Sequence, residues 1–311
     1  MPGSLILVNP QASKARNAST LAALTERAGL VLAERDGAEP RLVETAAADD
    51  VGPLVRHALD EGVASVVGVG GDGTMRDIAA VIAGSDVPLG IIPAGTGNQV
   101  AAVLGIPLTP LKAVDALEGA VIRTIDLGEL EIRRPDGTME PSIFLLGCGG
   151  GFDAELMATT SPDLKRRIGT AAYFAQGARL ALRMPARSCR LTLDERSFET
   201  EAAIALIGNM GQLVPGRLGL RLPLDPSDGL LEVIVVSGRG LVSGLRGLLD
   251  QLRRTELGGE AGDRSLRLRG RSVAIEPLEP MPLQVDGDYV GEGSLHARIR
   301  PGALRVLVPT A

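Results

Sequence analysis

The stretch Val66–Thr74 constrains the fold of this chain more than any other feature. It reads VVGVGGDGT, an apolar run that leads directly into a glycine turn with one acid and one hydroxyl. Such a run is typical of a strand buried in a parallel sheet, and glycines after it allow the backbone to approach a phosphate closely. The N–H groups at the start of a following helix favour an anion. The stretch therefore predicts a strand–turn–helix unit with a phosphate site at the turn.

The acid in the turn limits which ligand the predicted phosphate site can bind. Gly68, Gly70 and Gly73 fit the G-x-G-x-x-G spacing of dinucleotide-binding proteins, but that pattern needs an acid at the end of the next strand, and here Asp86 precedes the next strand. Asp72 would repel a bare pyrophosphate. Two interpretations of Asp72 remain open: it acts through a metal ion, or it orders the loop. The alternative to a phosphate site is an ordinary strand-to-helix turn that binds no ligand.

Two further apolar runs end in candidate ligand-binding loops. Leu89–Ile92 leads into PAGTGN at 93–98 and a helix predicted at 98–104, and Leu5–Val8 ends in Asn9-Pro10 with Lys14 close behind. In open parallel sheets ligands bind beyond the carboxyl ends of the strands. We therefore expect these loops to converge on one nucleotide.

The pattern of elements changes near residue 126 and predicts two domains, 1–126 and 127–311. Domain 1–126 alternates apolar strands with helical patterns, which predicts a Rossmann-like α/β domain with a mostly parallel sheet. Domain 127–311 predicts a mainly antiparallel β-sandwich, with a C-terminal tail able to pack back on the first domain. Its predicted strands are 129–133, 143–146, 188–193, 202–207, 230–236, 265–269, 272–277, 297–299 and 304–308.

Composition excludes several classes of function. A net charge of −6, with two Tyr, four Phe and no Trp, argues against a nucleic-acid partner. The two Cys and two His lack metal-ligand spacing, so a zinc site is not expected. No basic-then-apolar leader is visible and no apolar run approaches the ~18 residues of a membrane span, so we expect a cytoplasmic protein.

Six motifs follow one another along the chain: Asn9-Pro10 with Lys14, GGDGT at 70–74, PAGTGN at 93–98, FDAE at 152–155, DGLLEV at 228–233 and DGD at 286–288. Their order resembles that of the diacylglycerol kinase catalytic-domain family, which includes bacterial lipid kinases and sphingosine and ceramide kinases and is related to the NAD kinases. The resemblance implies an ATP- and Mg²⁺-dependent lipid kinase that phosphorylates a hydroxyl of diacylglycerol or a similar lipid. Its expected partner is a lipid substrate at the membrane surface, where the protein would be peripheral; a homodimer is left open.

The resemblance also implies roles for individual residues. Those expected to bind the nucleotide are Asn9, Lys14, Thr45, Gly70, Gly71, Asp72, Gly73, Thr74, Gly95, Thr96, Gly97 and Asn98. Asp72 and Asp286 are the candidate catalytic residues, Asp286 as general base with Asp288 in support. The candidate metal ligands are Asp225, Asp228, the Leu230 carbonyl and Asp288. From the residues alone, Asp286-Gly287-Asp288 is equally a hairpin turn, and 225–230 equally a loop.

Some positions depart from the family pattern. Gln99 stands where an Asp usually follows GTGN, and Arg76 stands where an Asn is usual. Two alternatives to a lipid kinase therefore stay open: a kinase with a non-lipid acceptor, and a nucleotide-binding regulator. A helix is predicted at 161–184. The overlapping stretch 164–193 contains seven basic residues and no acid. These residues form either a solvated face or a surface that binds anionic lipid.

Overall fold

The computed structural model of the chain describes residues 3–14, 18–46, 50–159, 186–211, 224–237 and 265–310. These residues divide into two compact units, Met1–Leu127 with Pro301–Ala311, and Gly128–Arg300. The last eleven residues thus cluster with the first unit. The basic helix predicted at 161–184 lies outside the described residues.

The first unit is built on a parallel sheet. Its strands β1 (Leu5–Val8), β2 (Arg41–Glu44), β3 (Val66–Gly70) and β4 (Leu89–Pro93) lie in the order β2-β1-β3-β4, and the end of β15 (Asp288–Val308) pairs with β4 through Val306 and Leu89. Because β2 and β3 lie on opposite sides of β1, the chain changes direction across the sheet between β1 and β3. Ligands of open α/β sheets bind at this switch point, beyond the strand ends.

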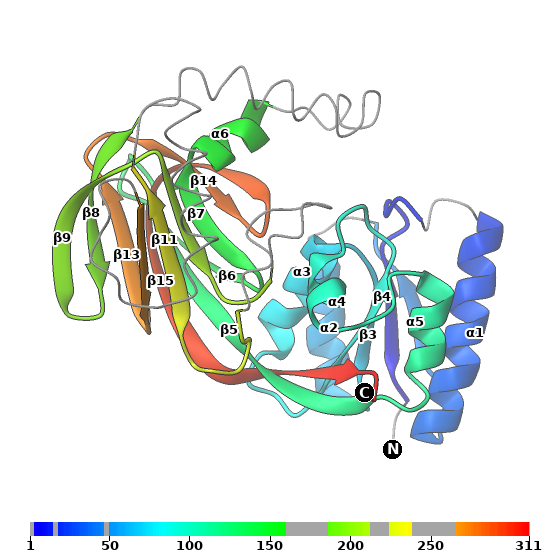
Figure 1. Cartoon of the computed structure of the whole chain (residues 1–311). Coiled ribbons are helices and arrows are strands. Elements are labelled where there is room, and N and C mark those ends of the chain that lie inside the picture. Colours follow the sequence, from blue (N-terminus) through cyan, green and yellow to red (C-terminus); the bar gives the residue numbers. More distant parts are fainter. Residues whose placement is uncertain are drawn as a thin grey trace. The chain divides into compact units, whose positions relative to one another are not determined.

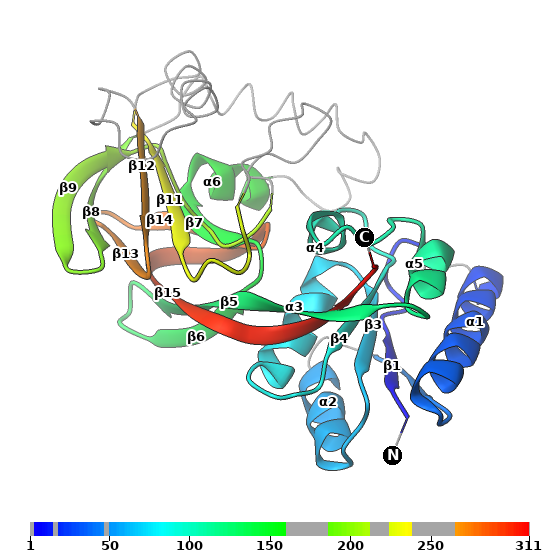
Figure 2. The same cartoon turned by 60° about the horizontal axis from the view of Figure 1, so that its bottom comes forward.

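Helices cover both faces of this sheet (Figure 1). Helices α1 (Ala18–Asp36) and α5 (Pro110–Ala116) bury Leu24, Leu32 and Val114 against one face, together with β-strand residues such as Ile6 and Val67. Helices α2 (Val51–Asp60) and α3 (Asp72–Ile82) pack against each other and the opposite face, as Figure 2 also shows. The three-layer arrangement explains why the strands read as continuous apolar runs.

One glycine of the opening motif serves this packing. A Cβ on Gly68 would lie 2.7 Å from side-chain atoms of both Ile78 and Met75 of α3. Gly68 therefore lets α3 lie close to β3, and this packing role belongs to the fold and not to a dinucleotide-binding pattern.

The second unit consists of two packed antiparallel layers. One layer has the order β12-β11-β10-β7-β14-β15, and the other joins β9, β8, β13, β15, β5 and β6. The bounds are β5 (Val121–Arg133), β6 (Met139–Phe144), β7 (Gly147–Gly151), β8 (Arg187–Leu193), β9 (Arg196–Ala202), β10 (Ile204–Gly208), β11 (Leu231–Val236), β12 (Ser265–Gly270), β13 (Ser272–Pro277) and β14 (Met281–Val285). Helix α6 (Phe152–Thr159) follows β7. The layers enclose a core that includes Phe144, Leu191, Ile207, Val233 and Leu283. The predicted fold class, a parallel α/β domain plus an antiparallel sandwich, is confirmed.

Several predicted strands were wrong in detail. The strands predicted at 297–299 and 304–308 belong to one strand, β15, in which Gly302 has a φ of 61°, and the run at 202–207 is divided between β9 and β10. The run at 143–146 ends as a strand at Phe144, because the backbone of the next residues turns to meet Asp286. The sequence analysis did not predict β7, β14, α5, α6 or most of β9.

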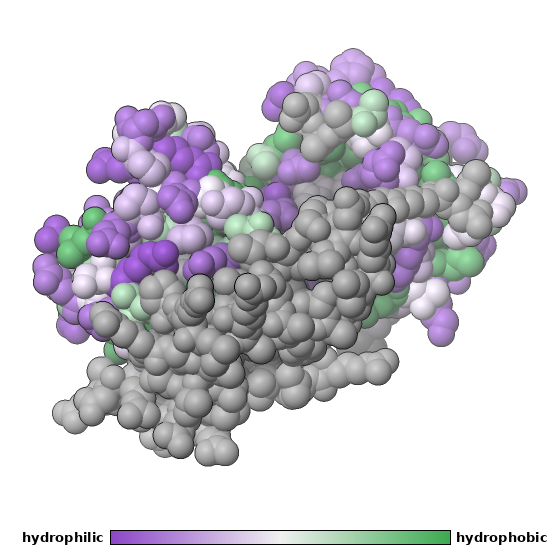
Figure 3. Space-filling model, turned by 90° about the horizontal axis from the view of Figure 1, so that it is seen from above, coloured by the Kyte–Doolittle hydropathy of each residue, from purple (hydrophilic) through white to green (hydrophobic). Residues whose placement is uncertain are grey.

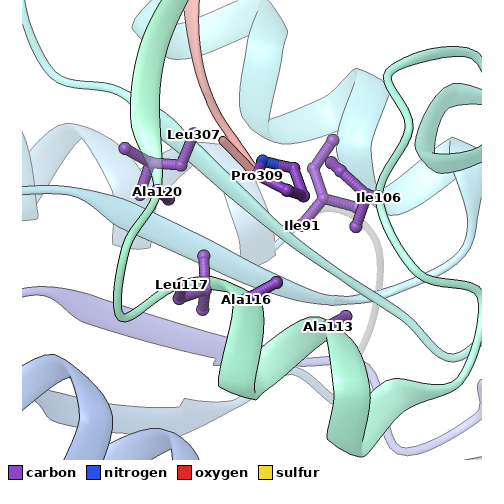
Figure 4. Close-up of a pocket in the computed structure, with 8 residues that line it drawn as sticks. All are labelled: Ile91, Ile106, Ala113, Ala116, Leu117, Ala120, Leu307 and Pro309. Atoms are coloured by element: carbon purple, nitrogen blue, oxygen red, sulfur yellow. The ribbon is translucent and has the colours of Figure 1, made fainter. Parts of the chain in front are cut away.

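Figure 4 shows a small apolar depression in the first unit. It is lined by Ile91, Ile106, Ala113, Ala116, Leu117, Ala120, Leu307 and Pro309. All eight side chains are apolar, so this depression is a packing feature and offers no group for chemistry. Among the described residues, no helix is long and apolar enough to cross a bilayer.

Candidate active site

Three loops meet at the carboxyl ends of β1, β3 and β4. The N–H of Asn9 donates to the Val69 carbonyl at 2.9 Å, and the N–H of Ala94 donates to the Gly70 carbonyl at 2.8 Å. The N–H of Lys14 in turn donates to the Ala94 carbonyl at 2.9 Å. The loops that the sequence predicted to converge are thus hydrogen-bonded to one another, at the switch point of the sheet.

Asp72 orders the second glycine loop. Its Oδ2 accepts the N–H of Gln99 and its Oδ1 accepts the N–H of Val100, each at 3.0 Å. These are the first two residues of α4 (Gln99–Val103), whose own N-cap residue, Asn98, makes no side-chain capping bond. A carboxylate at a helix N-terminus satisfies N–H groups that have no partner within the helix and lies at the positive end of its dipole. Of the two interpretations of Asp72, the structure shows the ordering role.

Asn98 stabilises the same loop by hydrogen bonds to another of its residues, Gly95. It has a left-handed backbone with φ 52°, and only 5% of it is exposed. Its Oδ1 accepts the Gly95 N–H at 2.9 Å, and its Nδ2 donates to the Gly95 carbonyl at 2.7 Å. Asn tolerates this conformation better than most residues, which explains the residue type at the end of PAGTGN.

The glycines allow the two loops to touch. A Cβ on Gly95 would lie 2.6 Å from the Cα of Gly71, and a Cβ on Gly70 would lie 2.4 Å from Thr74 Oγ1. A Cβ on Gly97 would be 3.1 Å from the Oδ2 of Asp72. Any larger residue at position 95 would push two backbones apart. The turn following β3 and the turn following β4 therefore form one rigid backbone surface, from which Thr96 and Gly97 are exposed.

The remaining predicted nucleotide ligands hold the loops by their side chains. Asn9 Nδ2 donates to Thr74 Oγ1 at 3.2 Å, across the switch point. Thr45, which is 6% exposed, donates its hydroxyl to the Val8 carbonyl at 3.2 Å. The Lys14 ammonium donates to the Leu108 carbonyl at 2.9 Å. Asn9 and Thr74 thus belong to the loop framework, and Thr45 ties the end of β2 to β1.

The Asp286-Gly287-Asp288 motif is a hairpin turn between β14 and β15. Asp286 and Gly287 have φ values of 49° and 88°, and the flanking residues Val285 and Asp288 are paired. Positive φ at both central residues matches the tight turns that Asp-Gly favours.

The Asp286 carboxylate is hydrogen-bonded to the backbone. Its Oδ2 accepts the Leu145 N–H at 3.0 Å, and its Oδ1 accepts the N–H groups of Leu146 and Gly147 at 2.8 and 3.0 Å. These three bonds fix the chain as it enters β7. Asp286 as general base stays a prediction: its oxygens accept N–H groups of the protein's own backbone, and the side chain of Asp288 lies in an exposed part of the same turn.

The predicted magnesium ligands do not fit a metal site. The Oδ1 of Asp228 accepts the Leu230 N–H at 3.0 Å, and its Oδ2 is paired with Arg269. The Oδ1 of Asp225 accepts both the N–H and the hydroxyl of Ser227, at 3.0 Å each. Within the described ranges no three acidic, His or Cys side chains are close enough to hold a metal ion. The carboxylates of Asp225 and Asp228 thus serve local turns and a guanidinium. The set of Asp225, Asp228, Leu230 and Asp288 stays a prediction that these contacts do not support.

Both units match known family models. Residues 4–130 match the model of the diacylglycerol kinase catalytic domain, and residues 148–308 match the YegS C-terminal NAD kinase β-sandwich-like domain.

Similar whole proteins point the same way. The chain is 34% identical over 284 residues to a Pseudomonas aeruginosa protein named "Probable lipid kinase YegS-like", covering 90% of this chain and 88% of the relative. It is 35% identical over 273 residues to the protein of that name from Pseudomonas fluorescens, covering 84% and 83%. A crystal structure of a "putative diacylglycerol kinase" from Bacillus anthracis shares the fold, with a TM-score of 0.77 at 20% identity over 98% of this chain and 95% of the other.

The fold and the loop site, taken with these similarities, define the class: a two-unit chain of the lipid kinase family. The chain belongs to the diacylglycerol kinase catalytic-domain family and, within it, to the YegS-like lipid kinases.

Proposed function

We propose that this chain transfers the γ-phosphate of ATP to a hydroxyl of a membrane lipid, with diacylglycerol as the first acceptor to test. The observation that carries the proposal is the joined surface of the turns following β3 and β4, held by Asp72 and Asn98. It presents backbone amides and the start of α3 at the switch point of a parallel sheet, which favours a phosphate chain.

The reaction depends more on how the phosphate groups are positioned than on strong acids or bases. In phosphoryl transfer the charge spreads over the transferred oxygens in a loose transition state, so fixed donors supply most of the catalysis. The rigid contact between Gly71 and Gly95 supports such fixed donors. ATP enters as its magnesium complex, as a substrate, and the chain's own residues hold its phosphates in place.

We propose Asp288 as the residue that accepts the proton of the acceptor hydroxyl. Asp288 begins β15 next to Asp286, and its exposed position in the turn allows an acceptor to approach it. A weakly basic carboxylate suffices, because the proton leaves late in a loose transition state.

The lipid acceptor implies a peripheral encounter with a membrane. On the face seen in Figure 3, the coloured residues are mostly hydrophilic and the hydrophobic ones form small groups. The basic stretch over 164–193 in the sequence supports attraction to anionic headgroups, at about 1 kcal/mol for each near-surface cation.

The test is a transfer assay with γ-labelled ATP and magnesium. The acceptors are diacylglycerol, ceramide and sphingosine, each in anionic vesicles, with glycerol as a soluble acceptor. Labelled lipid extracted into organic solvent is the expected product, and Asp288→Asn should abolish it while ATP binding persists. Label on glycerol alone would identify a non-lipid kinase. ATP binding without transfer to any acceptor would replace the proposal with a nucleotide-binding regulator.

A further inference from the structure

Four charged side chains form a cluster on β11, β12 and the loop that precedes β11, here named the acid–arginine cluster: Asp228, Glu232, Arg267 and Arg269. Glu232 lies opposite Arg269 in the antiparallel register, and Arg267 lies opposite Ile234, two residues further along the same face. The alternate residues Leu231 and Val233 enter the core of the second unit, so the cluster lies on the other face of this layer.

The cluster buries a carboxylate. Only 3% of the Glu232 side chain is exposed, against 13% for Arg267 and 28% for Arg269. Glu232 Oε1 is hydrogen-bonded to Arg267 Nε, and Glu232 Oε2 lies 3.9 Å from Arg269 Nε. A carboxylate so buried needs such pairing, because its desolvation is otherwise uncompensated.

Arg269 also reaches the loop that the family resemblance assigns to magnesium. Its Nη2 is paired with Asp228 Oδ2, while Asp228 Oδ1 accepts the Leu230 N–H at 3.0 Å. One guanidinium thus lies between an acid of the 225–230 loop and the buried acid of β11. Two carboxylates face two guanidinium groups, so the cluster carries no excess negative charge that would attract a divalent cation.

We propose that Arg269 takes the structural place of a divalent cation, so that the second unit keeps its stability without magnesium. A guanidinium suits this role, because it stays charged and its planar fork of donors can serve two carboxylates at once. The proposal concerns folding stability and is independent of the proposed kinase activity.

Thermal unfolding of the full chain without nucleotide tests the proposal. The Tm of the wild type and of Asp228→Asn is measured in EDTA and in 20 mM MgCl₂. We expect magnesium to change the Tm of both proteins equally. If no cation binds at Asp228, any effect of magnesium on the Tm comes from elsewhere in the chain and is the same in both. A magnesium-dependent rise in the wild-type Tm that Asp228→Asn abolishes would show a cation bound at this loop and overturn the proposal.

Arg269→Gln supplies the complementary measurement. In EDTA its Tm should fall by roughly 5 °C or more, since two carboxylates lose their shared partner. Magnesium should restore part of that loss by mass action. The control is Arg298→Gln, which removes a 72% exposed arginine 3.8 Å from Glu129 and should leave the Tm nearly unchanged. A loss no larger than the control's, or one that magnesium does not reduce, would contradict the proposal. If Arg269→Gln fails to fold, the comparison of wild type with Asp228→Asn still decides.

Discussion

Single carboxylates determine how the loops of this kinase are held. Asp72 and Asp286 both stand in motifs that suggest chemistry, and both place their oxygens on backbone N–H groups of distant segments. Hydrogen bonds to a charged acceptor contribute about 1.5–3 kcal/mol each, more than bonds between neutral groups. The two aspartates can therefore set backbone positions that glycine-rich segments would not hold by themselves.

Asp72→Asn should loosen the start of α4. The amide keeps one acceptor oxygen and turns an N–H₂ group towards an N–H donor, so we expect a loss of about 1–2 kcal/mol in the free energy of unfolding and a several-fold weaker affinity for ATP. Urea unfolding and ATP titration measure the two effects. The control is Asp86→Asn, because the side chain of Asp86 is 90% exposed. Equal stability and equal ATP affinity in wild type and Asp72→Asn would contradict the ordering role.

Asp286→Asn and Asp288→Asn should fail in different ways. Asp286→Asn should lower the free energy of unfolding by about 2 kcal/mol or more, because three N–H donors lose a charged acceptor. Asp288→Asn should lower the free energy of unfolding less than Asp286→Asn does, yet lose transfer by about 10²–10⁴-fold, the usual contribution of a positioned base. Urea curves and initial rates on both variants separate them. The assignment fails if Asp286→Asn is as stable as wild type but inactive.

Elements in the described part of this protein touch through their backbones at several places, and two of these bear on what the sequence could predict. One is the contact of the turns that follow β3 and β4, and the other is β7, whose sequence GCGGG is a poor strand former. A Cβ on Gly147 or Gly149 would lie 2.5 or 2.4 Å from a carbonyl oxygen of β10. Pairing with β10 and β14 on either side keeps this strand extended, which explains why local sequence did not predict it.

Gly95→Ala tests the loop contact. The new Cβ would meet the Gly71 Cα at 2.6 Å, so the two turns must separate, and we expect ATP affinity to fall about 10-fold or more. Gly119→Ala is the matched control, because a Cβ at that position meets nothing within 4 Å. ATP titration of both variants gives the answer, and similar affinities in the two would mean that this contact does not shape the nucleotide site.

At the scale of the whole molecule, the two cysteines link the stability of the fold to pH. Cys148 and Cys189 are both free thiols and both buried in its core. Burial raises the pKa of the Cys189 thiol from 9.0 to about 11. The folded state therefore binds more protons than the unfolded state between these two values, and the free energy of unfolding falls as the pH rises through this window.

Urea unfolding between pH 8 and pH 11 should show this loss. Stability that is fully present below about pH 9 should decline towards pH 11 by about 2–3 kcal/mol for the shift of this thiol. Cys189→Ala removes the titrating group, so its stability should depend less steeply on pH over the same range. Parallel curves for wild type and Cys189→Ala would mean that other groups dominate the alkaline response.

The sequence by itself determined the parallel strands, their glycine turns and the division into an α/β part and a β-rich part. These features are local: buried strands need continuous apolar residues, and backbones that approach closely need glycine. Only the tertiary structure decided what the acids do. Asp72 meets residues 27 and 28 positions away, Asp286 meets residues about 140 away, and Asp228 pairs with an arginine 41 away. A carboxylate can bind a metal, accept a proton or cap a backbone, and its residue type does not choose among these roles. The partner that folding brings to it makes that choice.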